Sequence, residues 1–133
     1  MLQGYECVLT PDYSLYTDML QPVKIWNTYR SRAIGQYFQE CGIKVIPTVS
    51  WADKDSYDYC FRGIEEGGII AVSTIGVKKN KNALKLWKEG MAKAIECLEP
   101  ETILVYGGKI DFDFGNIQIV NYDNLIERRF DKL

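Results

Sequence analysis

The sequence predicts one α/β domain over residues 1–133, with a mostly parallel sheet of about four or five strands and flanking helices. Apolar, β-branched runs that are typical of buried strands alternate with segments of helical periodicity. Glycine or proline residues stand at most of the boundaries, and the links have ordinary lengths. An open three-layer sheet is favoured over a partial TIM-like barrel, because a complete barrel needs roughly 200 residues or more.

The predicted strands are short apolar runs, each bounded by turn-forming or hydroxyl residues. They cover residues 5–10, 44–49, 69–73, 102–106 and 117–120, and the last is expected at a sheet edge. The other elements of the chain are interpreted relative to the strand over residues 44–49. It follows a helix that stops at Gly42, and it ends at Ser50 and Trp51. In parallel sheets this is the end that opens onto ligands.

The predicted helices cover residues 22–41, 53–61, 80–98 and 123–130, with Asp53 and Asn80 as the expected caps of the second and third. In the first helix, apolar residues recur at three- and four-residue steps and predict the face that packs on the core. They are Trp26, Tyr29, Ala33, Ile34, Tyr37 and Cys41. Arg30 falls within this face, whereas Arg32 is expected on the solvent side.

Composition excludes several classes of protein. A net charge of -2 makes nucleic acid an unlikely partner, and no apolar run approaches the ~18 residues that span a bilayer. The default location is therefore the cytoplasm. The absence of histidine excludes Ser-His-Asp and Cys-His catalysis. The four cysteines stand far apart and are expected to be buried free thiols.

Residues that follow four predicted strands are expected to converge on one edge of the sheet. They mix hydroxyl, aromatic, glycine and basic residues, a set that suits either a planar anionic ligand or a protein interface. The candidate ligand-binding residues at these ends are Asp12, Tyr13, Ser14, Ser50, Trp51, Ser73, Thr74, Gly76, Lys78, Tyr106 and Gly107. The segment 73–79 has the composition of an anion cradle but lacks a P-loop pattern, so a plain tight turn explains it equally well.

Arg30 is the sharpest single candidate on the first helix. An arginine in an apolar stripe needs a partner, because an unpaired buried charge is costly. It either forms a structural ion pair with Asp12 or Asp18 or binds an anion at the rim. Asp12, Asp18 and Asp53 are also candidate acids for Mg²⁺ or for acid–base catalysis, although no metal-ligand spacing supports this.

Several blocks of this chain resemble the family known as domain of unknown function 4417, found in bacteria, their phages and mobile elements. The blocks lie within residues 9–16, 25–32, 42–51, 60–64, 72–76 and 105–107. Trp26 and Asn27, which lie in the second block, are also candidate ligand-binding residues. Members of that family usually carry an extra N-terminal segment, and Glu65 stands where they typically have proline. The resemblance implies a phage or mobile-element context and no particular activity.

The leading hypothesis is a small protein that binds an anionic, nucleotide-like molecule at the strand-end rim, with Arg30, Ser73, Thr74, Gly76 and Lys78 holding phosphate. In it Trp51 or Tyr106 stacks on the ligand. A protein–protein interaction factor, such as a phage counter-defence inhibitor of a host protein, is the alternative. A Mg-dependent hydrolase is the third hypothesis. No cofactor is expected otherwise, enzymatic activity is left open with binding favoured, and a homodimer is considered.

Overall fold

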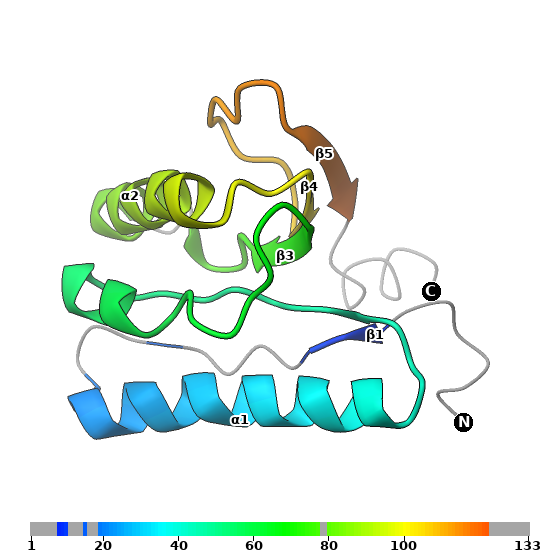
Figure 1. The fold of residues 1–133 in the computed structure, drawn as a ribbon. Coiled ribbons are helices and arrows are strands. Elements are labelled where there is room, and N and C mark those ends of the chain that lie inside the picture. Colours follow the sequence, from blue (N-terminus) through cyan, green and yellow to red (C-terminus); the bar gives the residue numbers. More distant parts are fainter. Residues whose placement is uncertain (1–7, 11–14, 16–18, 78–79, 123–133) are drawn as a thin grey trace, which may run out of the picture.

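The chain folds as an α/β structure in which short parallel strands are flanked by helices (Figure 1). The computed structural model describes residues 8–10, 15, 19–77 and 80–122. The predicted class is confirmed, and the helix predicted over residues 123–130 lies outside the described residues. The elements are β1 (Val8–Leu9), α1 (Gln21–Glu40), β2 (Val45–Ile46), the 3-10 helix η2 (Lys54–Asp58), β3 (Ile69–Ser73), α2 (Lys81–Leu98), β4 (Thr102–Tyr106) and β5 (Gln118–Tyr122).

Two of the predicted helix boundaries are confirmed. Gly42 follows α1 with a φ of 80°, and its N–H donates to the Gln39 carbonyl, a closing turn that favours glycine. Asn80 caps α2, because its Oδ1 accepts from the Ala83 N–H at 2.7 Å. The expected cap at Asp53 is wrong, since its side chain makes no cap bond to η2. No helix in the described ranges is long and apolar enough to span a bilayer.

The strands are all parallel and their spatial order follows the chain. One ladder joins β1 to β2, and a second has the order β3-β4-β5. A single bridge between Thr48 and Ala71 connects the two ladders, with the Val49 N–H donating to the Ala71 carbonyl at 2.8 Å. A doubly wound three-layer sheet reverses its strand order, whereas consecutive neighbours are the order of a β/α barrel. The order therefore agrees better with the barrel segment that sequence reasoning ranked second.

The hydrophobic core lies between α2, η2 and one face of β3 and β4. Ile70 and Val72 of β3 are buried with Ile103 and Val105 of β4. From α2 the core receives Trp87, Met91 and Leu98, which recur at helical spacing and form one face of the helix. The Trp87 ring lies 5.9 Å from that of Trp51, and its Nε1–H donates to the Ser73 carbonyl at 2.9 Å. The core thus holds Trp51 and the end of β3 in place.

The cysteines are free thiols in the described structure, but they are not uniformly buried as predicted. Cys41 and Cys97 are exposed, Cys60 is fully buried, and Cys7 lies outside the described residues. Cys41 is exposed because it follows the last turn of α1 on the helix's outward side. Burial raises the pKa of Cys60 from 9.0 to about 12.

We expect alkylation by iodoacetamide to be about 100-fold or more slower at Cys60 than at Cys41 and Cys97, because the thiolate is the reactive form and Cys60 needs local opening. Peptide mapping by mass spectrometry measures this. Equal labelling at Cys60 and Cys97 under native conditions would contradict the structure, and equal labelling in denaturant is the control. Because the Cys60 thiol is buried in its neutral form, its raised pKa makes stability depend on pH. The contribution of this thiol to the free energy of unfolding is complete below pH 9.0 and is lost as the pH rises towards 12. The raised pKa of Tyr59 acts in the same direction.

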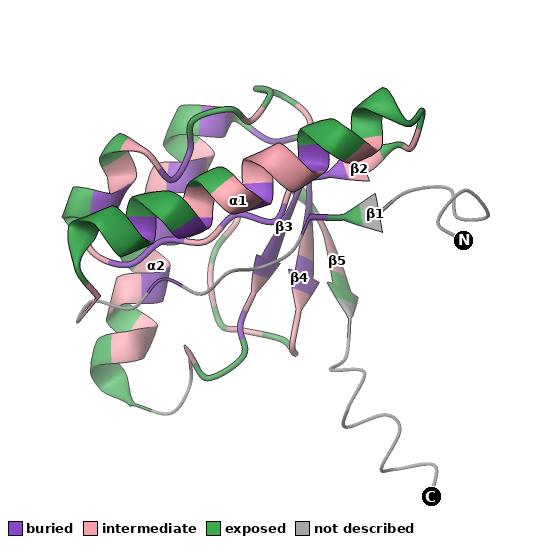
Figure 2. Cartoon of the chain, turned by 90° about the horizontal axis from the view of Figure 1, so that it is seen from below, coloured by how far each residue is buried: buried purple, intermediate pink, exposed green. Residues whose placement is uncertain are grey.

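Helix α1 presents to the sheet the side opposite to the one predicted. Its buried residues are Lys24, Asn27, Ser31 and Gly35. Trp26, Tyr29 and Tyr37 are instead 55%, 60% and 62% exposed. Figure 2 shows exposed segments along much of α1. The surface that α1 covers is itself polar, and a Cβ on Gly35 would lie 2.8 Å from Thr10 Cγ2. Close approach and hydrogen bonding, and not apolar burial, therefore orient this helix.

Arg32 is a second correction, because its side chain crosses to the segment after η2 and does not point into solvent. Its Nε donates to the Arg62 carbonyl at 2.9 Å, and its Nη2 donates to the Cys60 carbonyl at 2.6 Å. Desolvation lowers the pKa of Arg32 from its usual value. The guanidinium therefore connects α1 to the turn after η2, which is not part of a strand ladder.

Candidate functional site

A group of buried polar side chains lies between α1 and the carboxyl ends of β1 and β2. Lys24, Asn27 and Ser31 point inward from α1 with exposures of 3%, 7% and 5%. We call this group the polar cluster. Its members are Thr10, Lys24, Asn27, Arg30, Ser31, Thr48 and Asp53.

Hydroxyl groups join the two strand ends to the helix. The Thr48 N–H donates to Thr10 Oγ1 at 2.7 Å, and Thr48 Oγ1 donates to the Thr10 carbonyl, also at 2.7 Å. Ser31 Oγ donates to Thr10 Oγ1 at 3.2 Å. These bonds replace regular ladder bonds where the strands stop, so the cluster sits where a parallel sheet opens to ligands.

Lys24 is the most unusual member of the cluster. Its Nζ lies 3.5 Å from Asp53 Oδ1, and its side chain is 4% exposed. Asp53 Oδ1 is buried and has no hydrogen-bond partner in the described structure. An ammonium group that is nearly buried needs compensating negative charge. Asp53 supplies it through Oδ1, the same oxygen, at a separation that makes an ion pair and not a hydrogen bond.

Arg30 lies at the outer margin of the cluster and is half-buried. Its Nη2 donates to Asn27 Oδ1 at 2.6 Å, which links the guanidinium to the inward face of α1. Its predicted partners, Asp12 and Asp18, lie outside the described residues. With Lys24 and Arg30 against Asp53, the described members of the cluster carry a net positive charge.

The other predicted strand ends form a separate group at β3 and β4. The Thr74 N–H donates to the Tyr106 carbonyl at 2.8 Å, and Thr74 Oγ1 donates to the Gly108 carbonyl at 3.0 Å. The Ile75 N–H donates to Ser73 Oγ at 3.2 Å, and the Val77 N–H donates to the Thr74 carbonyl. These amides are turned to the protein's own oxygens. The geometry therefore resembles the tight-turn alternative more than an anion cradle.

Gly107 belongs to this second group for a steric reason. Its φ is 106°, and a Cβ there would lie 3.0 Å from the backbone nitrogen of Ile75. Glycine at this position lets the loop after β4 close on the loop after β3. Gly76 also has a positive φ, of 77°, and is exposed.

The aromatic candidates are spread over three environments. Trp51 is 9% exposed within the core, Tyr106 is half-buried, and Trp26 stacks on Tyr29 on the outward side of α1, with ring centroids 5.6 Å apart. Ser50 is half-buried beside Trp51. The structure therefore does not gather these aromatic rings round one space. Four further candidates, Asp12, Tyr13, Ser14 and Lys78, lie outside the described residues.

Sequence reasoning missed four members of the cluster, Thr10, Lys24, Ser31 and Thr48. A usable signal was present, because Lys24, Asn27, Ser31 and Gly35 recur at three- and four-residue steps, the spacing of one helix face. That face is polar, so an apolar-periodicity argument passes over it. Among the described residues no group of three or more cysteine or acidic side chains is placed to hold a metal ion.

Comparison with known proteins gives the family of this chain. The profile described as "Domain of unknown function (DUF4417)" matches residues 1–123. "Gene 1 protein" of Mycobacterium phage D29 is 37% identical over 129 residues, which cover 96% of this chain and 48% of that protein. "Gene 1 protein" of Mycobacterium phage L5 is 43% identical over 99 residues, covering 74% and 43% respectively. No solved structure matches.

The chain spans less than half the length of these two curated relatives. Their similarity places it among proteins of phage type, and their names state no activity. With 123 of its 133 residues matched by the family profile, this chain belongs to the DUF4417 family of proteins of unknown function.

Proposed function

We propose that this phage-type protein binds an anionic, nucleotide-like small molecule at the polar cluster. The observation that supports the proposal is the pair of cationic side chains in the cluster, the nearly buried Lys24 and the half-buried Arg30, against the single carboxylate of Asp53. A phosphate group is a suitable ligand, because Lys and Arg are the side chains that bind phosphate most often. Asn27 and the Asp53 carboxylate offer further polar contacts to a base or a sugar hydroxyl.

This proposal moves the predicted phosphate contacts from β3 and β4 to β1 and β2. Arg30 and Asn27 remain in it from the sequence-based hypothesis, and Lys24 and Ser31 join them. The amides after β3 are bonded internally, so they have less to offer an anion than the cationic side chains of the cluster. Stacking by Tyr106 or Trp51 is not needed for this mode of binding.

A thermal-shift screen against nucleotides, cyclic nucleotides and sugar phosphates tests the proposal. A ligand at 100 times its Kd stabilises the folded state by ~2.7 kcal/mol, which raises the Tm by roughly 5–15 °C for a chain of this size. We expect Arg30→Ala to lose most of the shift while circular dichroism shows a folded protein. Lys81→Ala removes one positive charge from an exposed position at the start of α2, and it should keep the full shift.

Three results would count against this proposal. A flat screen would exclude these ligand classes, and equal loss in Lys81→Ala would indicate non-specific charge attraction. A shift lost in Lys78→Ala and kept in Arg30→Ala would return the site to the loop after β3. Turnover of a bound compound that requires Mg²⁺ would instead support the hydrolase alternative with Asp12 or Asp53.

A protein–protein interaction is the second candidate function, and one observation favours it. The outward side of α1 exposes Trp26, Tyr29 and Tyr37, residue types that are enriched at interfaces. A phage counter-defence factor that binds a host protein would use such a surface. This candidate predicts that Trp26→Ala lowers binding to a host protein and leaves any small-ligand shift unchanged.

A further inference from the structure

The positive charge of this chain is concentrated in one short segment. Residues 78–93 contain six of the 16 basic residues and one of the 18 acidic residues, Glu89. This segment therefore carries a charge of +5, and the remaining residues together carry -7, because the whole chain carries -2. The expectation that nucleic acid is not a partner rests on the net charge, which averages these two regions. A basic segment along one helix is the electrostatic feature of many nucleic-acid-binding proteins.

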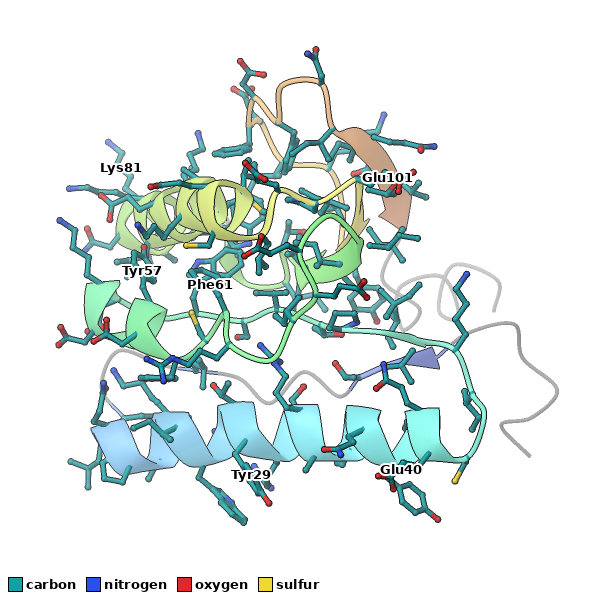
Figure 3. All side chains as sticks on the ribbon, viewed as in Figure 1. Tyr29, Glu40, Tyr57, Phe61, Lys81 and Glu101 are labelled. Atoms are coloured by element: carbon teal, nitrogen blue, oxygen red, sulfur yellow. The ribbon has the colours of Figure 1, made fainter. Side chains whose placement is uncertain are left out.

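Three of these lysines form a stripe on the surface of α2. Lys81, Lys85 and Lys88 follow one another at steps of four and three residues, so they lie on one face of the helix. Lys81 and Lys85 are exposed and Lys88 is half-buried, whereas Trp87 points into the core. Figure 3 shows Lys81 on the side of α2 away from α1. We call these three residues the lysine stripe.

The lysine stripe is not balanced by negative charge among the described residues. The ion pairs of these residues join Lys24 to Asp53 and Lys93 to Glu96, and none includes a member of the stripe. The first turn of α2 contains no acidic residue. Like charges three or four residues apart destabilise a helix, and lysines near its N-terminus oppose the helix dipole. The stripe therefore lowers the stability of the free protein, and an anionic partner would relieve both effects.

The surroundings of the stripe favour duplex DNA over other anionic partners. None of the large apolar side chains that are exposed in the described residues lies on α2, whereas protein interfaces and membrane-bound helices use such side chains as anchors. Single-stranded nucleic acid stacks its bases on aromatic side chains, and the aromatic residue of α2, Trp87, is 6% exposed. Duplex DNA needs neither kind of side chain, because it carries one negative charge per about 1.7 Å of its axis.

We propose that α2 lies against duplex DNA, with Lys81, Lys85 and Lys88 contacting phosphate groups. The rise of an α-helix places these lysines at successive steps of about 6 Å and 4.5 Å along the axis, so each has phosphate within reach. Ala92 continues the same face with a small exposed side chain, which allows close approach. The major groove of B-form DNA admits an α-helix, and that of A-form RNA is too deep and narrow. Phosphate contacts carry no sequence information, so we expect the affinity to depend little on base sequence.

Fluorescence anisotropy of a labelled duplex of about 20 base pairs tests this proposal, which does not depend on the proposed ligand site. Three phosphate contacts predict a slope of about -2.7 for the logarithm of the binding constant against that of salt concentration, or roughly 40-fold weaker binding at 200 mM than at 50 mM salt. The triple variant Lys81→Gln, Lys85→Gln, Lys88→Gln should bind about 10-fold or more weakly at 50 mM salt. Lys78 and Lys79, outside the described residues, can steepen the slope, and the triple substitution should still reduce its size by about 2.7.

Two single variants and one stability measurement serve as controls. Lys44→Gln removes the same charge from an exposed position just before β2, at the opposite end of the strands from the start of α2, and should leave affinity and slope unchanged. Glu89→Gln removes the acidic residue of segment 78–93 and should tighten binding. The triple variant should melt at or above the temperature of the unmodified chain, because it removes like-charge repulsion from α2.

The proposal is overturned if duplex DNA does not bind at 50 mM salt or if Lys44→Gln weakens binding as much as the triple variant does. Single-stranded DNA or duplex RNA bound as tightly as duplex DNA would exclude docking of α2 in the groove of B-form DNA. A triple variant that melts at a lower temperature would assign the lysines to the fold itself. Tighter binding by Glu89→Gln, together with the reduced slope of a fully folded triple variant, would establish the lysine stripe as the contact.

Discussion

Replacing Gly90 by alanine is expected to lower the free energy of unfolding by about 3 kcal/mol or more. Gly90 lies in the interior of α2, where alanine normally stabilises a helix by ~1 kcal/mol. Here a Cβ would stand 2.5 Å from Trp51 Cε2 and closer still to Nε1 and Cδ1. The Trp51 ring occupies the space of that methyl group and is itself packed against Trp87 and Phe61. It cannot move without displacing the core.

Chemical denaturation monitored by tryptophan fluorescence and circular dichroism measures this loss, which corresponds to a Tm lowered by roughly 10 °C or more. Gly68→Ala is the control, because a Cβ there has its nearest neighbour at an ordinary 3.8 Å. In a Trp51→Phe background the smaller ring should reduce the cost of Gly90→Ala. An unchanged or raised stability in Gly90→Ala would show that α2 and Trp51 do not pack as described.

Replacing Arg32 by alanine is expected to lower the free energy of unfolding by about 2–3 kcal/mol, since hydrogen bonds to charged groups contribute about 1.5–3 kcal/mol each and this side chain is partly exposed. Both acceptors, the carbonyls of Cys60 and Arg62, would lose their cationic donor. Lysine should recover less than half of the loss, because it lacks the planar fork that reaches two carbonyls at once.

Arg62→Ala is a stringent control for this effect. Arg62 contributes its backbone carbonyl to the contact while its side chain is exposed, so the substitution removes the same charge from nearly the same place. We expect urea denaturation to show a change within ~0.5 kcal/mol. If Arg62→Ala costs as much as Arg32→Ala, net charge and not the two hydrogen bonds explains the loss.

The parts of the fold that the sequence predicts well are those in which apolar pattern and burial coincide. Trp87, Met91 and Leu98 of α2 recur at helical spacing and are buried, and Asn80 caps the helix as its chemistry suggests. The run Ile69–Ser73 has the continuous apolar character of a parallel strand with two covered faces.

The same reasoning fails for α1, because its polar side faces the sheet and its apolar side faces outward. Periodicity identifies the apolar side correctly, but hydrophobicity does not say whether that side meets the core of its own chain or a different surface. The deciding facts are distant in sequence, namely the hydroxyls of Thr10 and Thr48 and the close contact at Gly35. Arg32 is missed for a similar reason, since a backbone carbonyl 28 residues away leaves no mark in the local pattern.

The structure distributes the predicted site residues over more than one place and leaves their role in binding a prediction. Strand ends did attract polar residues, but the amides after β3 bond to Tyr106 and Ser73, and Trp51 serves the core. The polar cluster takes its cations from α1, of which the sequence analysis identifies Arg30 and misses Lys24. The prediction of a ligand therefore stays a prediction, now attached to Lys24, Asn27 and Arg30.

The connection between the two strand ladders has a consequence for how the protein opens. The β1–β2 ladder has two residue pairs, whereas the β3–β4–β5 ladder has five pairs at each junction, and a single bridge at Thr48 joins them. Cooperative units with few shared bonds separate before the molecule unfolds as a whole. The unit made of β1, α1 and β2 is therefore expected to exchange its amide hydrogens through partial unfolding, with α2 and its strands still intact. The polar cluster belongs largely to that weaker unit, and its Lys24–Asp53 ion pair reaches outside the unit, so a ligand bound there would also oppose this partial unfolding.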